Sequence, residues 1–484
     1  MPVEQQDKSN QLRVISFEPH LVQIEIVDFK KWKEENSDND IKIGSFLKIE
    51  DGNEKNILVL VKSFKMKPKH LEEETATEID EYFGTFVINT QPVGQLEKRG
   101  DKYEFIKGIK NISIPPNGVS VASDEEIKNI FSIDDASKLI FSEHLVNPDI
   151  KIEIDGDKFF SKHIAVVGST GSGKSCTVAK IIQEAKSVRE SQALNNSHII
   201  IFDIHGEYDK AFPNANSLSV ENNSLKLPYW LMNSEELEDM FIESNESNSH
   251  NQVSQFKYAV IENKKKHNPQ LKVTYDSPVY FSLDEIYNFI CNKNNLTTYE
   301  KDSKTYFAIT SSEIEYDENE LWNKMSFEQS TGNSKHQILK EKVSKDGGFN
   351  GEFNRFISRL ETKMNDERLN FILHTKKEDD TEYKTADFQN LVEQLLGYIQ
   401  DNTKNITIVD LSSLPFEVVS IVVSIISRIV FDFAYFSTKI AGNDKTNETP
   451  FMLVYEEAHK YIPKNGEVRY KNTRLAVERI AKEG

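Results

Sequence analysis

The sequence HIAVVGSTGSGKS, residues 163–175, carries the strongest structural signal in the chain. Its part from Gly168 to Ser175 matches the pattern G-x-x-x-x-G-K-[S/T] at every fixed position. The apolar run 163–167 precedes the match and an amphipathic pattern that starts at Thr177 follows it, so the loop is predicted to join a strand to a helix. Because both flanks fit, we favour a phosphate-binding loop over a glycine-rich turn that holds no nucleotide.

The residue types in this loop suit the binding of a nucleoside triphosphate. Glycines let the backbone curl so that several N–H groups point at the phosphates, and the N-terminus of the following helix adds partial positive charge. Lys174 can neutralise the β- and γ-phosphates, and the hydroxyl of Ser175 can bind Mg²⁺. We therefore predict ATP and Mg²⁺ as cofactors. The residues predicted to contact the nucleotide are Gly168, Ser169, Thr170, Gly171, Ser172, Gly173, Lys174, Ser175 and Cys176.

A second apolar run, FMLVYEE at 451–457, ends in two adjacent carboxylates, which is the pattern of a Walker B strand. Glu456 is expected to hold the Mg²⁺ shell together with Ser175, and Glu457 to polarise the attacking water. Lys174 completes the predicted catalytic group. The two glutamates could exchange roles, because Asp is commoner than Glu at the first position. A strand followed by an ordinary acidic loop is the alternative, less favoured beside a complete phosphate loop.

Strand and helix patterns alternate from residue 160 onward, which predicts a parallel sheet. We therefore predict an α/β P-loop ATPase core of the RecA-like type, with a small N-terminal β-barrel and a helical insertion. The predicted domains are a β-barrel at 1–120, a connecting helix capped by Ser123 and a linker at 121–159, the first part of the core at 160–230, the helical insertion at 231–400 with an irregular polar segment at 292–350, and the second part of the core at 401–484.

Composition limits the class of protein. The formal net charge of −19 weighs against a protein that coats nucleic acid, but not against a ring whose basic residues face inward. Only two cysteines, Cys176 and Cys291, are present, which fits a reducing compartment. The most apolar run, 418–426, is far shorter than the ~20 residues that a bilayer requires. Arg428 and Asp432 then interrupt it. We expect a cytoplasmic protein without a membrane anchor.

Several polar residues allow two interpretations. Asp203, His205 and Glu207 follow a buried-strand pattern and should lie at the nucleotide edge of the sheet. A role in ordering the attacking water and a role in forming the turn are about equally favoured.

Basic residues are equally open to two interpretations. Arg355, Arg359 and Arg368 lie on a helical stretch, where the first two are four apart and share a face, and they could reach a phosphate of DNA or of a neighbouring subunit. Intrahelical ion pairs, with Glu361 or Asp366, are the favoured alternative. For the three lysines at 264–266, a solvated surface is favoured over contact with DNA.

Three segments together resemble the HerA-type ATPases, which are relatives of the FtsK DNA translocases. They are the phosphate loop at 163–175, IIIFDIHGEY at 199–208 and EEAHKYIP at 456–463. The β-rich N-terminus is similar to the HAS-barrel that precedes this ATPase domain, so the resemblance covers essentially the whole chain. It implies a homohexameric ring with ATP at the subunit interfaces and double-stranded DNA in the pore. It also implies an effector, a nuclease or a Sir2-type NADase, docked on the barrel in anti-phage defence.

The resemblance further implies parts that would follow residue 484. Members of this family continue with a strand that carries a polar sensor residue and with a C-terminal segment that braces the neighbouring subunit. We therefore expect the core to be truncated at its C-terminus. The trans-acting arginine of the family would lie near this end, where Arg479 is the first candidate and Arg474 a weaker one.

Two functional hypotheses follow. In the first, the chain is an ATPase that couples hydrolysis to DNA translocation as a helicase-like hexameric motor. In the second, it is an ATP-binding ring scaffold that assembles and activates the effector with little or no translocation. Comparing Lys174→Ala with Glu457→Gln separates them, because a scaffold that needs only bound ATP keeps its function in the second variant.

Overall fold

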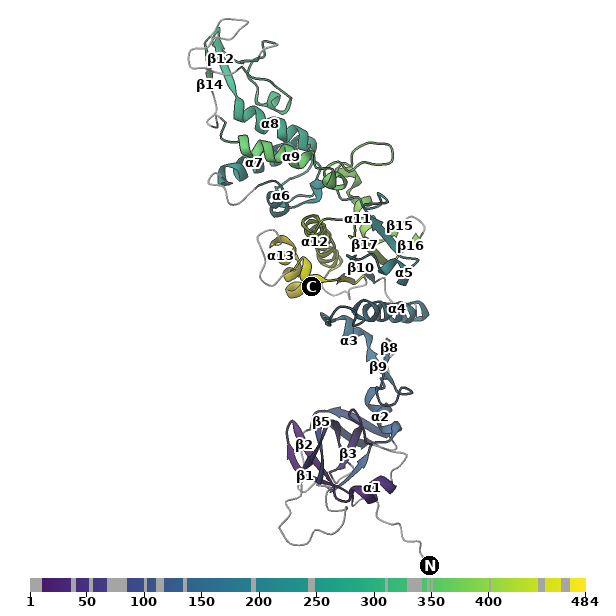
Figure 1. Cartoon of the computed structure of the whole chain (residues 1–484). Coiled ribbons are helices and arrows are strands. Elements are labelled where there is room, and N and C mark those ends of the chain that lie inside the picture. The colour runs from purple at the N-terminus through teal and green to yellow at the C-terminus, as the bar shows by residue number, and fades with distance from the viewer. Residues whose placement is uncertain are drawn as a thin grey trace, which may run out of the picture. The chain divides into compact units, whose positions relative to one another are not determined.

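A computed structural model describes most of the chain (Figure 1). The described residues are 11–35, 41–51, 55–67, 85–99, 102–109, 117–133, 137–192, 197–242, 249–309, 312–328, 342–345, 349, 351–399, 402–442, 449–462 and 471–484. They fall into two compact units, residues 1–194 and 195–484, and each unit is described by itself.

The N-terminal part of the first unit is a seven-stranded antiparallel sheet. Its strand order is β1-β2-β5-β4-β3-β7, with β6 paired to β5, and β1 also contacts β7, so the two ends of the order meet. Val22, Ile24 and Ile26 of β2 are all buried, as the alternating pattern predicts. The elements are β1 (Leu12–Glu18), β2 (Leu21–Ile26), α1 (Phe29–Glu35), β3 (Phe46–Glu50), β4 (Lys55–Lys67), β5 (Thr85–Arg99), β6 (Lys102–Lys107) and β7 (Asn117–Val121).

A connecting region follows this sheet within the first unit. The predicted helix cap is confirmed, since Ser123 and Glu126 form a reciprocal capping box at the start of α2. The elements of this region are α2 (Asp124–Phe131), the antiparallel pair β8 (Lys138–Glu143) and β9 (Lys151–Asp155), α3 (Gly156–Phe160) and α4 (Lys174–Gln192).

The strand predicted before the phosphate loop is wrong. Residues 161–173, between α3 and α4, contain no strand. A strand needs a ladder partner for its backbone N–H and C=O groups, and no described residue of the first unit pairs with 163–167. Ile164 is 43% and Val167 87% exposed. Apolar composition alone therefore misled the prediction here.

The second unit contains the predicted parallel sheet. Four strands lie in the order β11-β17-β10-β18, and every neighbouring pair is parallel. Near-continuous apolar runs such as HIIIFD are typical of strands that are buried on both faces. The core elements are β10 (His198–Asp203), α5 (Tyr208–Ala211), β11 (Asn216–Ser219), β17 (Ile406–Asp410), α12 (Phe416–Ala441), β18 (Phe451–Tyr455), the 3₁₀ turn η7 (Ala458–Lys460) and α13 (Lys471–Glu483).

Helix α12 is the central helix of this core and contacts β18 and α13. Its stretch Val418–Ile440 is the single span among the described residues that is long and apolar enough to cross a membrane, and 61% of its most apolar window is buried inside the protein. Arg428, in the middle of the span, lies 2.8 Å from the carboxylate of Glu236. Burial and this ion pair together identify α12 as a helix of the protein core.

The predicted helical insertion contains helices and also small sheets (Figure 1). The segment 292–350, predicted to be irregular, holds a three-stranded antiparallel sheet in its described part. Tyr299 and Phe307 are buried there. A few aromatic residues are enough to form a small core, although the segment has a polar overall composition. The elements are η3 (Tyr229–Leu231), α6 (Ser234–Phe241), α7 (Ser249–His267), α8 (Leu283–Asn295), β12 (Thr297–Lys301), β13 (Lys304–Phe307), η4 (Glu318–Trp322), β14 (Val343–Lys345), α9 (Asn354–Met364), η5 (Glu367–Leu369), α10 (Asn370–Leu373), η6 (Thr385–Asp387), α11 (Phe388–Leu396), β15 (Tyr398–Ile399) and β16 (Asn402–Thr403).

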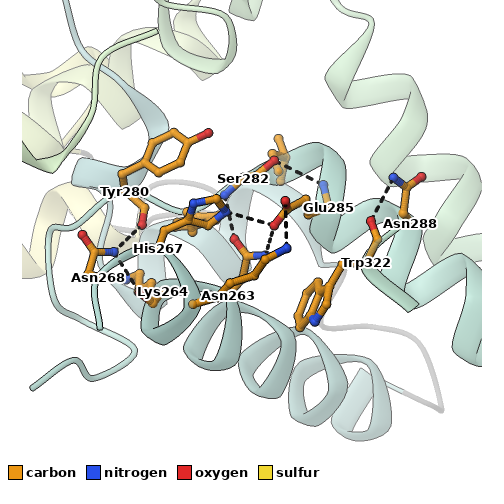
Figure 2. A network of polar contacts seen from close by, with 12 residues as sticks. Asn263, Lys264, His267, Asn268, Tyr280, Ser282, Glu285, Asn288 and Trp322 are labelled. Atoms are coloured by element: carbon orange, nitrogen blue, oxygen red, sulfur yellow. Dashed lines mark hydrogen bonds and ion pairs between the residues drawn. The ribbon is translucent and has the colours of Figure 1, made fainter. Parts of the chain in front are cut away.

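A polar network joins α7 to α8 (Figure 2). The carboxylate of Glu285 accepts hydrogen bonds from Asn263 at 2.6 Å and Lys266 at 3.0 Å, and it lies 3.0 Å from Nε2 of His267. These contacts hold the pKa of Glu285 below its usual value against the opposing effect of burial. The ammonium group of Lys264 is buried and donates to two backbone carbonyls, those of Tyr275 and Ser277.

Candidate functional site

The phosphate loop in the first unit depends on its glycines. Gly171 and Gly173 have φ angles of +79° and +90°, a backbone region that other residues adopt only with strain. A Cβ atom at Gly168 would clash with the hydroxyl of Ser172. The loop therefore favours glycine at Gly171 and Gly173 through their backbone angles, and a side chain at Gly168 would require Ser172 to move, which fits a backbone that closes around a phosphate group.

The loop leads directly into the N-terminus of α4. Lys174 is the first residue of this 19-residue helix, and its Nζ donates to the carbonyl of Ser169 at 3.3 Å. Ser175 is half-buried, whereas Cys176 is exposed with a free thiol. The exposed amide groups of a helix start favour an anion, and Lys174 adds a full positive charge beside them. The residues present fit a bound nucleotide phosphate.

In the second unit, Glu456 directly follows β18 and is 8% exposed. Its Oε2 accepts a hydrogen bond from the backbone N–H of Ile204 at 3.1 Å, and its carbonyl accepts one from the phenol of Tyr461 at 2.7 Å. The Glu456 carboxylate is thus held at the carboxyl end of the neighbouring strand β10. A buried, oriented carboxylate fits the predicted role of a Mg²⁺ ligand.

Glu457 adopts an unusual backbone conformation. Its φ angle is +45°, in the left-handed region, which costs a non-glycine residue about 1 kcal/mol or more. Its carboxylate lies 3.3 Å from Nδ1 of His459. Strained backbone of this kind concentrates at functional sites, and here it redirects the chain from β18 into η7.

Asp203 forms the turn after β10. It is 1% exposed, and its carboxylate accepts hydrogen bonds from the backbone N–H groups of His205, Gly206 and Tyr208 at 3.1, 2.8 and 2.9 Å. Of the two interpretations of this segment, the structure gives Asp203 the turn-forming one. Asp410, at the end of β17, caps its own loop in the same way by accepting from Ser412 N–H at 2.9 Å.

The two other residues of this segment stay exposed. His205 lies with its Nε2 3.5 Å from Nζ of Lys460 in η7, and Glu207 makes no capping hydrogen bond at the start of α5. Both belong to the edge at which β10 and β18 end. The role in ordering the attacking water that the sequence predicts for His205 and Glu207 therefore stays a prediction.

The parallel sheet brings the acidic residues to one edge. Phe202 of β10 pairs with Tyr455 of the parallel strand β18. The next residues along the two strands, Asp203 and Glu456, therefore lie at the same end of the sheet. The phosphate loop belongs to the first unit and these acids to the second. The pairing of Lys174 with Glu456 across a bound nucleotide stays a prediction.

Both candidate trans-acting arginines are engaged on α13. Arg479 lies 3.5 Å from Asp432 and 3.2 Å from Glu483, with its guanidinium 4.7 Å from the ring centre of Phe431. Arg474 pairs with Glu478 at 2.7 Å. These pairs are half-exposed, and such pairs contribute only about 0–1 kcal/mol, so they can exchange for another anion.

The pair of Arg428 and Glu236 is a feature that the sequence analysis missed. Arg428 was interpreted as a break in an apolar run. Its guanidinium instead donates to the carboxylate of Glu236 and to the carbonyl of Leu231, and Ser424 donates to the same carboxylate. A lone cation inside an apolar helix pattern was the available signal, because a buried charge requires a partner.

Comparison with known proteins gives a family match. Residues 141–430 match the family described as the central domain of the helicase HerA. A probable helicase of Methanocaldococcus jannaschii is 26% identical over 206 residues, which cover 41% of this chain and 38% of that protein. The DNA double-strand break repair helicase HerA of Sulfolobus acidocaldarius is 40% identical over 112 residues, 22% of this chain and 20% of that protein. The chain thus spans less than half the length of these curated relatives.

One solved structure, VirB4 of Thermoanaerobacter pseudethanolicus, aligns with a TM-score of 0.36 and 10% identity, covering 72% of this chain and 83% of that one.

Proposed function

Because the chain belongs to the family of the helicase HerA central domain, we propose that it is an ATPase whose hydrolysis of ATP drives the movement of DNA. The observation that carries the proposal is a complete phosphate loop at the start of α4 together with an acidic strand end. Lys174 and the loop amides bind the β- and γ-phosphates. Curated relatives that are named DNA double-strand break repair helicases support DNA as the substrate.

The residues of both halves fit the chemistry of phosphoryl transfer. Ser175 and Glu456 are the residues that would hold Mg²⁺, which neutralises phosphate charge when bound. Glu457 orients and polarises the attacking water, and the different partners of the two carboxylates, Ile204 N–H for Glu456 and His459 for Glu457, support this division of roles. His205 and Glu207, exposed at the same sheet edge, are available to relay the nucleotide state.

The proposed assembly is a cytoplasmic homohexamer with ATP at the subunit interfaces. Arg479 is the proposed trans-acting arginine, released from its half-exposed ion pairs when a neighbour presents a phosphate. The seven-stranded N-terminal sheet is the proposed docking surface for an effector of the nuclease or Sir2 type, with anti-phage defence as the cellular role. The resemblance of the N-terminal sequence to the HAS-barrel supports this part.

A ring scaffold with little or no translocation is the second candidate. The net charge of −19 favours it, because an acidic chain attracts nucleic acid poorly. In a scaffold, ATP binding closes the ring and activates the effector, and hydrolysis is dispensable.

The experiment compares wild type, Lys174→Ala and Glu457→Gln for ATP hydrolysis with and without duplex DNA, for DNA movement, and for assembly by sedimentation. A motor shows DNA-stimulated hydrolysis in wild type that both variants lose. Two results together would establish the scaffold. Wild type would assemble with ATP but hydrolyse it equally with and without DNA, and the Glu457→Gln variant would assemble as well as wild type. Absence of nucleotide binding by wild type would refute both.

A further inference from the structure

Helix α9 of the insertion carries two polar rows. Arg355, Arg359 and Lys363 follow one another at intervals of four residues, and Phe356, Leu360 and Met364 are buried on the opposite side. Beside the cations runs a second row of hydrogen-bonding side chains. The two rows line a hollow of ≈ 510 Å³. We call these six residues the α9 cationic face: Asn354, Arg355, Ser358, Arg359, Thr362 and Lys363.

The spacing of the cations is regular. Residues four apart share one side of a helix, and successive positions rise by about 6 Å along its axis. The span from Arg355 to Lys363 is therefore about 12 Å. One strand of a nucleic acid duplex carries a phosphate about every 3.4 Å of helix axis, so about three to four phosphates fit this span. Hydroxyl and amide side chains, as in the second row, also bind phosphate oxygens.

The α9 cationic face contains no carboxylate. Glu361 is the acidic residue of α9, and its charge lies near Tyr287 and Cys291 of α8. Burial raises the pKa of Tyr287 to about 12, and the charge of Glu361 contributes to this rise. Arg355 is exposed and Lys363 is half-buried, and neither makes an ion pair within 4 Å with a residue that the structure describes, although the charge of Lys363 helps to lower the pKa of Asp366. Within this acidic chain the face is a local concentration of positive charge.

The ion pairs expected from the sequence occur elsewhere. Arg368 binds the carboxylate of Asp366 through two nitrogens, at 2.9 and 2.7 Å. Arg359 donates to the amide oxygen of Gln252 in α7 at 3.4 Å. The ion pair with Asp366 that the sequence analysis favoured is therefore observed for Arg368.

We propose that the α9 cationic face binds the phosphate backbone of a nucleic acid, an inference that rests on the proposed DNA motor. Regular cations, a row of neutral hydrogen-bonding side chains and an open hollow suit a repeating phosphate chain better than the irregular charges of a protein surface.

A structural connection links the face to the ATPase core. Helix α9 contacts α6, and Glu236 of α6 is held by Arg428 of α12. Nucleic acid bound to α9 can therefore bias the position of the core helix.

The test uses the full chain with two charge-matched variants. Arg355→Gln with Lys363→Gln removes two cations of the face, and Lys301→Gln with Lys304→Gln removes two cations that pair with Glu313 and Glu315. Affinity for a short fluorescent duplex, and for a single strand of the same sequence, is measured across salt concentrations. Thermal unfolding of each variant verifies the fold, since the substituted side chains of the face are exposed or half-buried.

For the face variant we expect weaker binding at every salt concentration. The slope of log affinity against log salt should shrink by about 0.9 per lost phosphate contact for duplex, or about 0.7 for single strand, so by about 2 for the duplex in total. The stimulation of ATP hydrolysis by DNA should fall with it. The control pair should match wild type. Whichever nucleic acid loses more affinity identifies the bound form.

Two results would overturn the proposal. One is unchanged affinity and salt slope in the face variant. The other is altered self-association in sedimentation with unchanged nucleic-acid binding, which would assign the face to the acidic surface of a second copy. Both leave the DNA motor intact if wild type still shows DNA-stimulated hydrolysis. A wild type that binds no nucleic acid at all refutes the motor and this inference together.

Discussion

The carboxylate of Glu456 accepts a hydrogen bond from the backbone N–H of Ile204 at 3.1 Å, which ties the end of β18 to the end of β10. Both groups are buried. Glu456 therefore has a structural partner in addition to its proposed role at Mg²⁺. The two roles can be separated, because the hydrogen bond needs only an acceptor oxygen whereas Mg²⁺ prefers a charged one.

Two substitutions of Glu456 should therefore differ. Glu456→Ala leaves the buried N–H of Ile204 without its acceptor and should lower the free energy of unfolding by about 1–3 kcal/mol. Glu456→Gln keeps an acceptor oxygen and should unfold close to wild type while losing Mg²⁺-dependent ATP hydrolysis. Chemical denaturation and hydrolysis assays measure the two effects. Equal stability of the two variants would show that the hydrogen bond contributes nothing.

Glu457→Gln should separate binding from hydrolysis. Loss of the group that polarises water should slow hydrolysis by about 10²–10⁴-fold. ATP affinity, measured with a fluorescent analogue, should stay within a few-fold of wild type because the phosphate loop is untouched. Lys174→Ala is the matched variant that should lose affinity itself. Rapid hydrolysis by Glu457→Gln would move the assignment to another residue.

Asp203→Ala should destabilise the second unit more than Asp410→Ala does. The first substitution leaves three backbone N–H groups near a buried position without their acceptor, whereas the second removes one acceptor contact at the surface. We expect a loss of about 1–3 kcal/mol or more for Asp203→Ala and less than 1 kcal/mol for Asp410→Ala. Denaturant titration of both variants provides the comparison. A larger effect at Asp410 would contradict the turn-forming assignment.

Sequence patterns predicted the local elements well. The parallel sheet followed from runs such as HIIIFD, and the cap of α2 followed from Ser123 at the start of the helical pattern. The family predicted from the three resembling segments is confirmed by the match over residues 141–430. Each strand run and the helix cap lie within a few consecutive residues, where periodicity and turn chemistry act directly.

Features that depend on distant residues were not predictable. Whether 163–167 forms a strand depends on a ladder partner, which composition does not specify. The lysines at 264–266 look alike in sequence, yet Lys264 is buried against Tyr275 and Ser277 while Lys266 pairs with Glu285. Partners of this kind come from other elements, so the sequence pattern of one helix cannot reveal them.

Removing one partner of the buried ion pair should be costly. Arg428→Met leaves Glu236, whose side chain is 2% exposed, without its cation and should lower the free energy of unfolding by about 3–5 kcal/mol. The double variant Arg428→Met with Glu236→Gln removes the stranded charge and should recover a large part of that loss. The double-mutant cycle, measured by denaturation, tests the coupling. Additive effects of the two single variants would contradict it.

Lys264 should make stability depend on pH in an unusual direction. Burial lowers the pKa of its ammonium group from the usual value of 10.5 to about 7, and the nearby charge of Asp276 only partly opposes this. Between about pH 7 and pH 10.5, Lys264 carries a proton in the unfolded chain that it lacks in the folded chain. Stability therefore rises as pH increases through this window, by at most about 1.4 kcal/mol per pH unit.

The Lys264→Met variant isolates this effect. Between about pH 7 and pH 9, the unfolding free energy of wild type should rise relative to that of Lys264→Met. This range lies below about pH 10, near which tyrosines ionise. Lys265→Met is the matched control, because Lys265 is exposed in an ion pair with Glu262. Its difference from wild type should stay flat. A flat profile for Lys264→Met as well would mean that Lys264 keeps its proton when folded, held by the carbonyls of Tyr275 and Ser277.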